Sequence, residues 1–399
     1  MADAGASAVA GSGRKLAVIG PLAVLVAMGQ GTLSLGLVFF ARDALGASKA
    51  ETGLLAGIWP LFYMASCHLS RPLTKRLRPR FCVLGATLSL AVLTMLLAQV
   101  RSLAPAFALN ALLGMTTALF WPPMMGWLAT NAEGAHLSRR LGIFNLCWSG
   151  GAIVSPTLAG RASELSARLP ILLSSGLFLL AALTILGAIL ALPGIRSDDD
   201  AHQREGDPGA TVSRGTPLRF SAWVGVFSTY LVLGVVLNVF PMAGRADLGL
   251  RAGQVGDLLF WRAIATSVAL GLLGRMKWWH FQGWQMVVGT LALGVAVADL
   301  ALACTPGPLA IALILGGIFV ALNYVNSLFH GAAGSSHRGV RMAIHESLLS
   351  AGLCIGASLG GIVYQHLGST QLLLGCAGVM GLTAMVQLVL VRWRTQTSG

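Results

Sequence analysis

The chain has 399 residues, of which 55% are hydrophobic and only 10% are charged, and its mean hydropathy is +0.76. Soluble domains carry roughly 25% charged residues, so this composition excludes an ordinary soluble domain and indicates a protein buried in lipid. The net charge of +13 does not indicate a nucleic-acid partner, because the Lys and Arg residues gather in short gaps between apolar runs.

Twelve apolar runs follow one another along the chain. Most of them approach or exceed the ~20 residues that a helix needs to cross the hydrocarbon layer. Only a helix satisfies its own backbone in lipid, so each run is predicted to be a transmembrane helix of an all-α membrane protein. The runs are 16–41, 53–70, 81–100, 103–129, 141–160, 169–193, 220–243, 255–274, 284–303, 307–329, 342–364 and 370–391.

The basic residues predict the orientation of these helices. If the N-terminus is cytoplasmic, nineteen Lys and Arg residues fall in inside segments and seven in outside segments, while Arg262 falls within a run. Positive residues concentrate on the cytoplasmic side of a membrane. We therefore expect a multi-pass protein of the inner (cytoplasmic) membrane, with both termini in the cytoplasm.

A polar stretch at 194–219 divides the runs into six and six. It holds five acidic residues and lacks apolar periodicity, which is typical of a flexible linker. The sequence thus predicts five parts. They are a cytoplasmic tail (1–15), a first six-helix bundle (16–193), a cytoplasmic linker (194–219), a second six-helix bundle (220–392) and a second tail (393–399).

The two halves repeat each other. RLGIFNLCWSGGAIVSPTLAG at 140–160 matches RMAIHESLLSAGLCIGASLGG at 341–361, at an offset of 201. LGASKAETGLL at 45–55 matches LGLRAGQVGDLL at 248–259, at an offset of 203. Two matches at nearly one spacing favour a parallel duplication, an architecture in which transporters place the solute site between the halves.

This plan resembles the major facilitator superfamily over the whole chain. The resemblance implies the fold of that superfamily, two parallel-repeat bundles of six helices, and secondary transport by alternating access. The superfamily's loop between its second and third helices usually reads Gly-x-x-x-Asp-Arg-x-Gly-Arg-Arg. Here SRPLTKRLRPR at 70–80 keeps the basic residues and lacks the Gly and the Asp, so a latch built on that Asp is not carried over.

Small residues recur four apart in the run 141–160. They are similar to the Gly-x-x-x-Gly-Pro-x-x-Gly-Gly motif of facilitator-type antiporters, and the run 342–364 repeats the pattern. Two interpretations stay open, close helix packing and a bearing on outward exchange. The residues are Gly151, Ser155, Pro156 and Gly160 in the first half and Gly352, Gly356, Gly360 and Gly361 in the second.

Two ionisable residues lie deep in predicted helices. Arg262 is ~15 Å into its helix at 1.5 Å per residue, and Glu346 enters from the cytoplasmic side. Such groups are costly in a membrane and mark functional sites by default. By the repeat they match Trp59 and Asn145, so the first half is uncharged at both places. They are candidates for solute binding and proton coupling, or for an ion pair that clamps two helices.

Uncharged polar and aromatic residues complete the candidate set. For any single Asn, the sequence favours an interhelical hydrogen bond over a contact with the solute. Trp59-Pro60 and Trp121-Pro122-Pro123 are predicted to break their helices, and His330 is expected to face water. The candidates are Gln30, Trp59, Trp121, Asn145, Asn238, Asn323, Tyr324 and Asn326.

Together these features predict a secondary active transporter of a small organic solute, with proton-coupled efflux by antiport as the first expectation. Two alternatives stay open: proton-coupled uptake of an anionic metabolite, which Arg262 could bind, and a non-transporting sensor or scaffold on the same fold. Neither a P-loop nor metal-ligand spacing is present, so we expect no enzyme activity, cofactor or metal. The expected partners are the solute, protons and the bilayer, and the expected state is a monomer.

Overall fold

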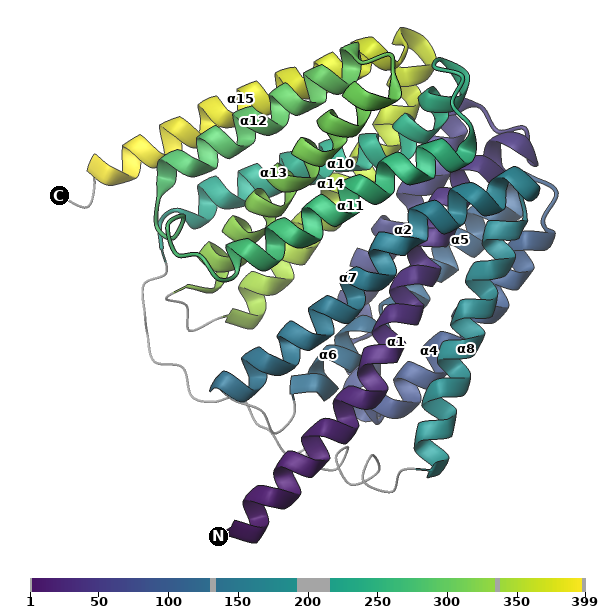
Figure 1. Ribbon diagram of the computed structural model, residues 1–399, viewed down its shortest axis with the longest axis vertical. Coiled ribbons are helices and arrows are strands. Elements are labelled where there is room, and N and C mark those ends of the chain that lie inside the picture. The colour runs from purple at the N-terminus through teal and green to yellow at the C-terminus, as the bar shows by residue number, and fades with distance from the viewer. Residues whose placement is uncertain (1, 130–133, 192–215, 334–337, 397–399) are drawn as a thin grey trace. The chain divides into compact units, whose positions relative to one another are not determined.

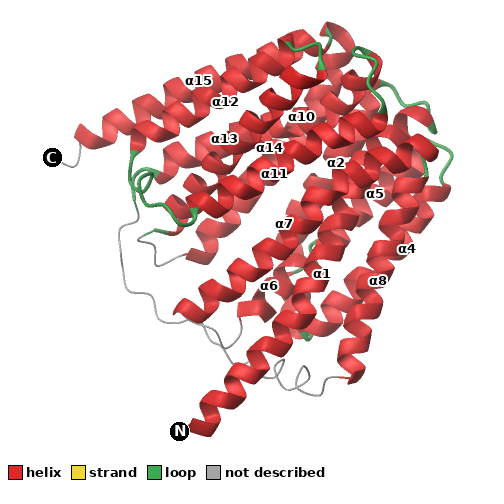
Figure 2. Cartoon of the chain, in the orientation of Figure 1, coloured by secondary structure: helices red, strands yellow, loops and turns green. Residues whose placement is uncertain are grey.

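The computed structural model describes residues 2–129, 134–191, 216–333 and 338–396, and within these ranges the chain forms helices and no strands (Figures 1 and 2). The first half holds α1 (Ala2–Asp43), α2 (Lys49–Leu69), α3 (Arg71–Arg76), α4 (Pro79–Gln99), α5 (Leu103–Thr117), α6 (Trp121–Ala129), α7 (Gly134–Leu165) and α8 (Leu169–Ala191). The second half holds α10 (Arg219–Ala246), α11 (Ala252–Leu273), α12 (Gly283–Leu302), α13 (Pro306–Ala332), α14 (Arg338–Leu367) and α15 (Ser369–Gln396).

All twelve predicted runs are helical. In the described residues, eleven segments are long and apolar enough to cross a membrane, and α5 and α6 together form one of them. The twelfth run is α2, which is 21 residues long. The predicted break at Trp121 is confirmed, because α5 ends at Thr117 and α6 begins at Trp121. The predicted break at Trp59-Pro60 is wrong: α2 continues through Pro60, since membrane helices can re-satisfy the backbone groups that a proline frees.

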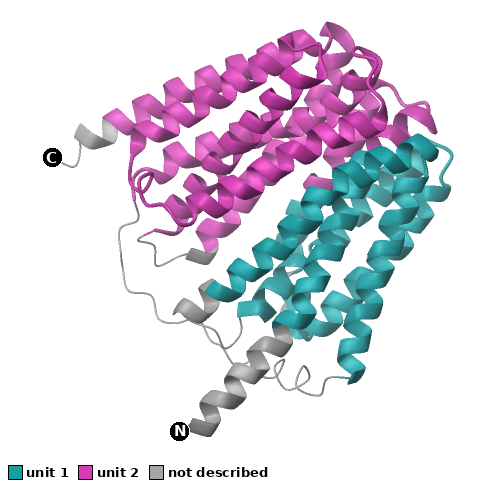
Figure 3. Cartoon of the chain, in the orientation of Figure 1, with its two compact units in different colours: residues 1–37, 62–207 teal, residues 38–61, 208–399 magenta. Residues whose placement is uncertain are grey.

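The helices form two compact units (Figure 3). Unit 1 comprises residues 1–37 and 62–207, and unit 2 comprises residues 38–61 and 208–399. In unit 1, α4 lies along α8 and α5, and α7 contacts α8 and α6. In unit 2, α10 lies along α14, α11 along α13 and α12 along α15.

The repeat is visible in the backbone where α1 and α10 end. The N–H groups of residues 44 and 45 both donate to the carbonyl of Phe40, and those of residues 247 and 248 both donate to the carbonyl of Ala243. Each helix is followed by a glycine in the left-handed region, Gly46 at φ +64° and Gly249 at φ +65°, which glycine adopts without steric cost. Every pair of positions is 203 residues apart, so the second sequence match corresponds to one conserved piece of geometry within this chain.

The small residues of the repeat are helix contacts. In unit 1, a Cβ at Gly151 of α7 would collide with the carbonyl oxygen of Val24 in α1. In unit 2, a Cβ at Gly352 of α14 would lie 2.7 Å from the carbonyl oxygen of Phe227 in α10. Val24 and Phe227 are themselves 203 residues apart. The same close crossing therefore occurs in both units, as expected for small residues in membrane helices.

The other motif residues extend these crossings. Ser155 lies against Gly31 of α1, and its equivalent Gly356 lies against the backbone of Leu231 in α10. Gly361 packs against Gly53, so the first half of α2 lies on α14 within unit 2. Pro156 is held inside α7, and Gly160 is buried there; Gly360 meets Val235 and Val239 of α10.

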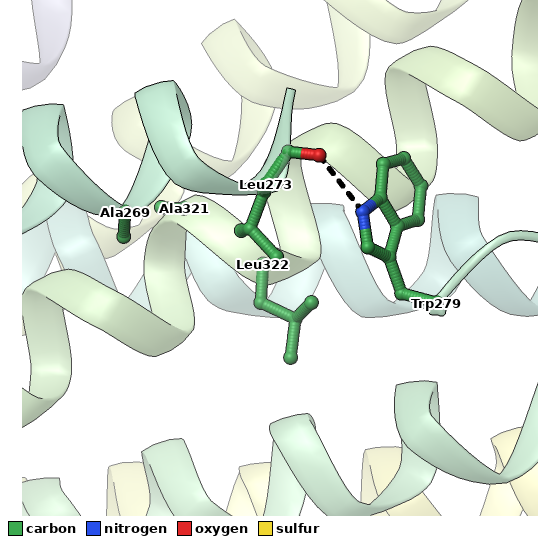
Figure 4. Close-up of a cluster of buried hydrophobic side chains, with 5 residues drawn as sticks. All are labelled: Ala269, Leu273, Trp279, Ala321 and Leu322. Atoms are coloured by element: carbon green, nitrogen blue, oxygen red, sulfur yellow. Dashed lines mark hydrogen bonds between the residues drawn. The ribbon is translucent and has the colours of Figure 1, made fainter. Parts of the chain in front are cut away.

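Ion pairing and packing fix the ends of unit 2. At one end, Arg245 forms an ion pair with Asp43, and Tyr364 donates to Asp247 at 3.0 Å. At the other end, Figure 4 shows an apolar cluster built by α11, α13 and the connection between α11 and α12. In that cluster the indole of Trp279 donates to the carbonyl of Leu273 at 3.0 Å.

Candidate functional site

A close crossing of two helices positions Arg262. Gly317 of α13 has no side chain, and a Cβ there would lie 2.6 Å from the carbonyl oxygen of Arg262 in α11. Thr266, one turn further along α11, donates from its hydroxyl to the carbonyls of Arg262 and Gly317, at 3.0 and 3.1 Å. The backbone at Arg262 is thus held by a close contact with Gly317 and by the hydrogen bond from Thr266.

Tyr230 connects this arginine to Glu346. The α10–α14 crossing places the Cβ of Tyr230 close to Gly352. Its phenol interacts electrostatically with Arg262 of α11, with Tyr324 of α13 and with Glu346 of α14. The ring centroids of Tyr230 and Tyr324 are 6.4 Å apart. Four helices of unit 2 therefore bring these four side chains, here called the Tyr–Arg–Glu group, into one neighbourhood.

The polar ends of the Tyr–Arg–Glu group are unpaired within the described residues. Arg262 and Glu346 do not form an ion pair there, and the Nε of Arg262 is buried without a hydrogen-bond partner. The two phenol hydroxyls likewise have no partner among the described residues. Glu346 is exposed and the other three are partly exposed. Because polar groups inside a membrane need partners, this group is arranged to meet water or a ligand.

The adjacent histidine points elsewhere. His345 is fully buried, its Nδ1 lies 2.8 Å from the Oγ of Ser327 in α13, and its ring lies 5.2 Å from that of Tyr324. The expected turn of about 100° between neighbouring helix positions separates the buried His345 from the exposed Glu346. His345 thus joins α13 to α14 behind the Tyr–Arg–Glu group.

The expectation that His330 faces water is wrong. Its ring is fully buried and lies 5.1 Å from the ring of Phe329 and 5.7 Å from that of Phe281. Phe281 lies in the connection between α11 and α12, and its own backbone has a φ of +56°. Aromatic packing from this segment covers the histidine, which hydropathy along the chain could not indicate.

Three of the candidate asparagines make structural hydrogen bonds. Asn326 and Gln285 of α12 exchange two bonds, at 2.7 and 3.1 Å, and both are buried. Asn323 accepts from Thr290 of α12 at 3.2 Å. Asn238 donates to the carbonyl of Gly234 in its own helix at 2.8 Å. These contacts match the interhelical alternative for Asn323 and Asn326.

Unit 1 holds an uncharged group around Trp121, the residue that matches Tyr324 at the offset of 203. Gln30 of α1 accepts from the indole of Trp121 at 3.1 Å and donates to Thr117 at 3.4 Å. The ring of Trp121 lies 6.1 Å from that of Phe144. Asn145, next to Phe144, is exposed in α7. The structure thus brings together Gln30 and Trp121, whereas Trp59 lies partly exposed in α2, in the segment assigned to unit 2.

One small cavity adjoins Arg262. It measures about 20 Å³ and is lined by apolar residues such as Val236, Leu293 and Ala312, besides Gly316. A volume of this size corresponds to about one water molecule and is too small for an organic solute. Among the described residues, no three His, Cys, Asp or Glu side chains lie together as a metal ion would require.

Tyr230 is the site residue that sequence reasoning missed. A tyrosine is common in helix packing, and no charge marks it as unusual in the run 220–243. The sequence does hold one signal for it: tyrosine is rare in this chain, which has four, and Tyr230 lies in the middle of an apolar run. Its place beside Arg262 and Glu346 follows only from the crossing of α10 and α14.

Comparisons with known proteins agree with this architecture. A family model described as the Major Facilitator Superfamily matches residues 19–221, just over half of the chain. The Staphyloferrin B transporter of Staphylococcus aureus (strain NCTC 8325 / PS 47) is 27% identical over 160 residues, which are 39% of this chain and 38% of that protein. The chain therefore matches about two fifths of the length of this curated relative.

Solved transporters share the fold. The nucleoside transporter NupG superposes with a TM-score of 0.75 at 14% identity, covering 94% of this chain and 99% of that one. A bacterial homolog of the human lysosomal transporter Spinster, in an inward-facing and occupied conformation, gives 0.75 at 14% identity, covering 94% and 96%. At such identities the likeness concerns the fold alone.

Proposed function

This chain belongs to the Major Facilitator Superfamily and is a multi-pass membrane transporter of that type, and on this premise we propose that it carries a small organic solute by proton-coupled alternating access. The Tyr–Arg–Glu group is the observation that carries the proposal. It places an unpaired cation, an exposed acid and two phenols on four helices of one unit. The cation and phenols supply donors for a solute, and Glu346 supplies a group that can gain and lose a proton.

The direction of transport has two candidate answers. Efflux by exchange with protons rests on the small-residue face of α7. Because α14 has small residues at the matching positions and makes the same backbone contact, close packing is a sufficient reason for that face. Uptake of an anion with protons, the second candidate, is favoured by the unpaired guanidinium of Arg262. We propose that the solute is bound in unit 2, with the inner membrane as the location and the monomer as the working form.

A flux experiment tests the proposal. Purified protein is reconstituted in liposomes loaded with a pH-sensitive dye, and a panel of metabolites is added outside with the pH gradient set in either polarity. We expect at least one solute to move protons across the membrane with wild-type protein, and no proton movement with Glu346→Gln or with empty liposomes. The sign of the lumenal pH change distinguishes uptake with protons from exchange. A non-transporting sensor would move no protons with any solute.

A further inference from the structure

We propose that Arg262, Tyr230 and Tyr324 form a binding site for a carboxylate-bearing solute, and that this anion binds together with a proton on Glu346. This inference rests on the proposed function and names the substrate class of the same site. It is carried by the arrangement of charges in unit 2, in which the guanidinium has no carboxylate partner among the described residues.

The first step concerns the cation. An arginine side chain stays charged in proteins, and a charge buried in a membrane is costly unless it is paired. Glu346 would be the obvious partner, yet the structure does not pair the two side chains. A guanidinium binds a carboxylate through two parallel hydrogen bonds. Arg262 is therefore matched to an anion that arrives from outside the chain.

The second step concerns the phenols. Tyr230 interacts electrostatically with Arg262, and the ring of Tyr324 lies 6.4 Å from that of Tyr230. Their hydroxyls can donate to the same anion because neither is engaged by a described residue. The rings also provide apolar faces for the uncharged part of the solute. One cation and two neutral donors suit a carboxylate better than a phosphate dianion, which would need more positive charge next to Glu346.

The third step concerns Glu346. Tyr230 interacts with both Arg262 and Glu346, so an anion held by Arg262 and Tyr230 lies in the field of the Glu346 carboxylate. At an effective dielectric constant of about 20, repulsion between two negative charges in one such group weakens binding roughly tenfold or more. Protonation of Glu346 removes this repulsion. Anion affinity should therefore rise as pH falls, which is the linkage that proton-coupled uptake requires.

Other charged and titratable groups near α14 need separate treatment in the test. On α14 itself they include Arg341, the buried His345, Cys354, Tyr364 and His366. Of the helices packed against it, α10 contributes Tyr230, α13 contributes Tyr324 and His330, and α15 contributes Cys376. A pH effect that arises from any of these groups persists in Glu346→Gln. An effect that arises from Glu346 disappears in that variant, even though the protonation of the ligand itself is common to both proteins.

The experiment measures binding without a gradient, so its outcome does not depend on transport. Protein in phosphatidylcholine nanodiscs is titrated by calorimetry with lactate, succinate and citrate, with their methyl esters and with inorganic phosphate, at pH 5.5 and pH 8.0. We expect at least one carboxylate to bind, its ester not to bind, and affinity to be about tenfold or more tighter at pH 5.5. In Glu346→Gln the pH dependence should shrink to that of ligand protonation.

Arginine variants complete the test. Arg262→Gln should weaken carboxylate binding by roughly thirtyfold or more. Arg262→Lys should weaken it by a smaller factor, because lysine keeps the positive charge but cannot form two parallel hydrogen bonds with a carboxylate. Arg275→Gln removes an exposed charge beyond the end of the same helix and should leave affinity unchanged. Wild-type binding with phosphatidylglycerol in the nanodisc distinguishes a lipid headgroup from a free anion. The proposal is overturned if no carboxylate binds, if Arg262→Lys and Arg262→Gln both bind like wild type, or if phosphatidylglycerol abolishes binding.

Discussion

His345 and Phe144 occupy matching places in the two halves of the chain, 201 residues apart. Phe144 contacts Trp121, and His345 contacts Tyr324, which follows Trp121 by 203 residues. Both positions therefore hold a ring edge-on to another ring. The second half adds a hydrogen bond between His345 and Ser327, which connects α13 to α14 next to Glu346.

Two substitutions of His345 distinguish the contribution of its ring to stability from that of its hydrogen bond. His345→Phe keeps the ring and leaves the buried hydroxyl of Ser327 without this partner, so we expect a loss of about 1 kcal/mol in unfolding free energy. His345→Ala also creates a cavity and should cost roughly 2–4 kcal/mol. Thermal and denaturant unfolding of the purified variants measures both. Equal losses in the two variants would show that the ring itself contributes nothing.

The structure also predicts the result of a double-mutant cycle on Arg262 and Glu346. A clamping ion pair would make the double variant Arg262→Leu, Glu346→Leu more stable than the single variants suggest. Because the two side chains do not pair but share Tyr230 as a neighbour, we expect their effects on the unfolding free energy to deviate from additivity by no more than about 1 kcal/mol. Transport should be lost in all three variants. A double variant that regains both stability and flux would refute the coupling role and establish a clamp.

For single residues, charge was the feature of the sequence that best predicted membership of the candidate site. Arg262 and Glu346 stood out because ionisable groups are rare inside apolar runs, and the structure places both beside Tyr230. Asn323 and Asn326 fit the candidate pattern equally well, yet they bond to Thr290 and Gln285. Which polar residue finds a protein partner depends on helix rotation and crossing, which no single run specifies.

The close crossings of α7 with α1 and of α14 with α10 predict the effect of a large side chain at the contact. Leucine at Gly151 or Gly352 must push apart two backbones that touch, so we expect each variant to cost ~1–3 kcal/mol and to reduce transport. Gly176→Leu in α8 is the matched control, because nothing lies within 4 Å of a Cβ at that position. Melting temperature and flux at matched expression measure the difference. Equal behaviour of Gly151→Leu and Gly176→Leu would contradict the packing role.

Helices were the most predictable elements, because lipid leaves a spanning segment little alternative. All twelve runs became helices, and most end within a few residues of the expected positions, although α1 begins at Ala2 and not at the predicted residue 16. The offsets of 201 and 203 recur as matching contacts. The effect of prolines was less predictable. Pro122 and Pro123 lie at the start of α6 after a real break, whereas Pro60 lies inside an unbroken α2, because neighbouring contacts decide whether a helix continues past a proline.

For the whole molecule, the division into bundles at 16–193 and 220–392 remains a prediction, since most of the linker 194–219 lies outside the described residues. All four residues of the Tyr–Arg–Glu group lie in unit 2, and the structure describes each of them. The repeat pairs Arg262 with Trp59 and Glu346 with Asn145. Because Trp59 and Asn145 carry no charge, the charged group belongs to the second half of the chain alone.

Orientation in the membrane is the last property that the sequence predicts and that experiment can decide. Nineteen basic residues against seven favour cytoplasmic termini. Ser102 between α4 and α5 is then outside, and Lys277 between α11 and α12 is inside; both are exposed. The native Cys304 is exposed at a predicted outer end, so the six native cysteines must first be replaced. In that background, an impermeant thiol reagent on intact cells should label Ser102→Cys and spare Lys277→Cys until the cells are opened. The reverse pattern would invert the orientation. Glu346 would then lie near the outer surface, and an inward proton gradient would protonate it before a solute from the cytoplasm reached the site.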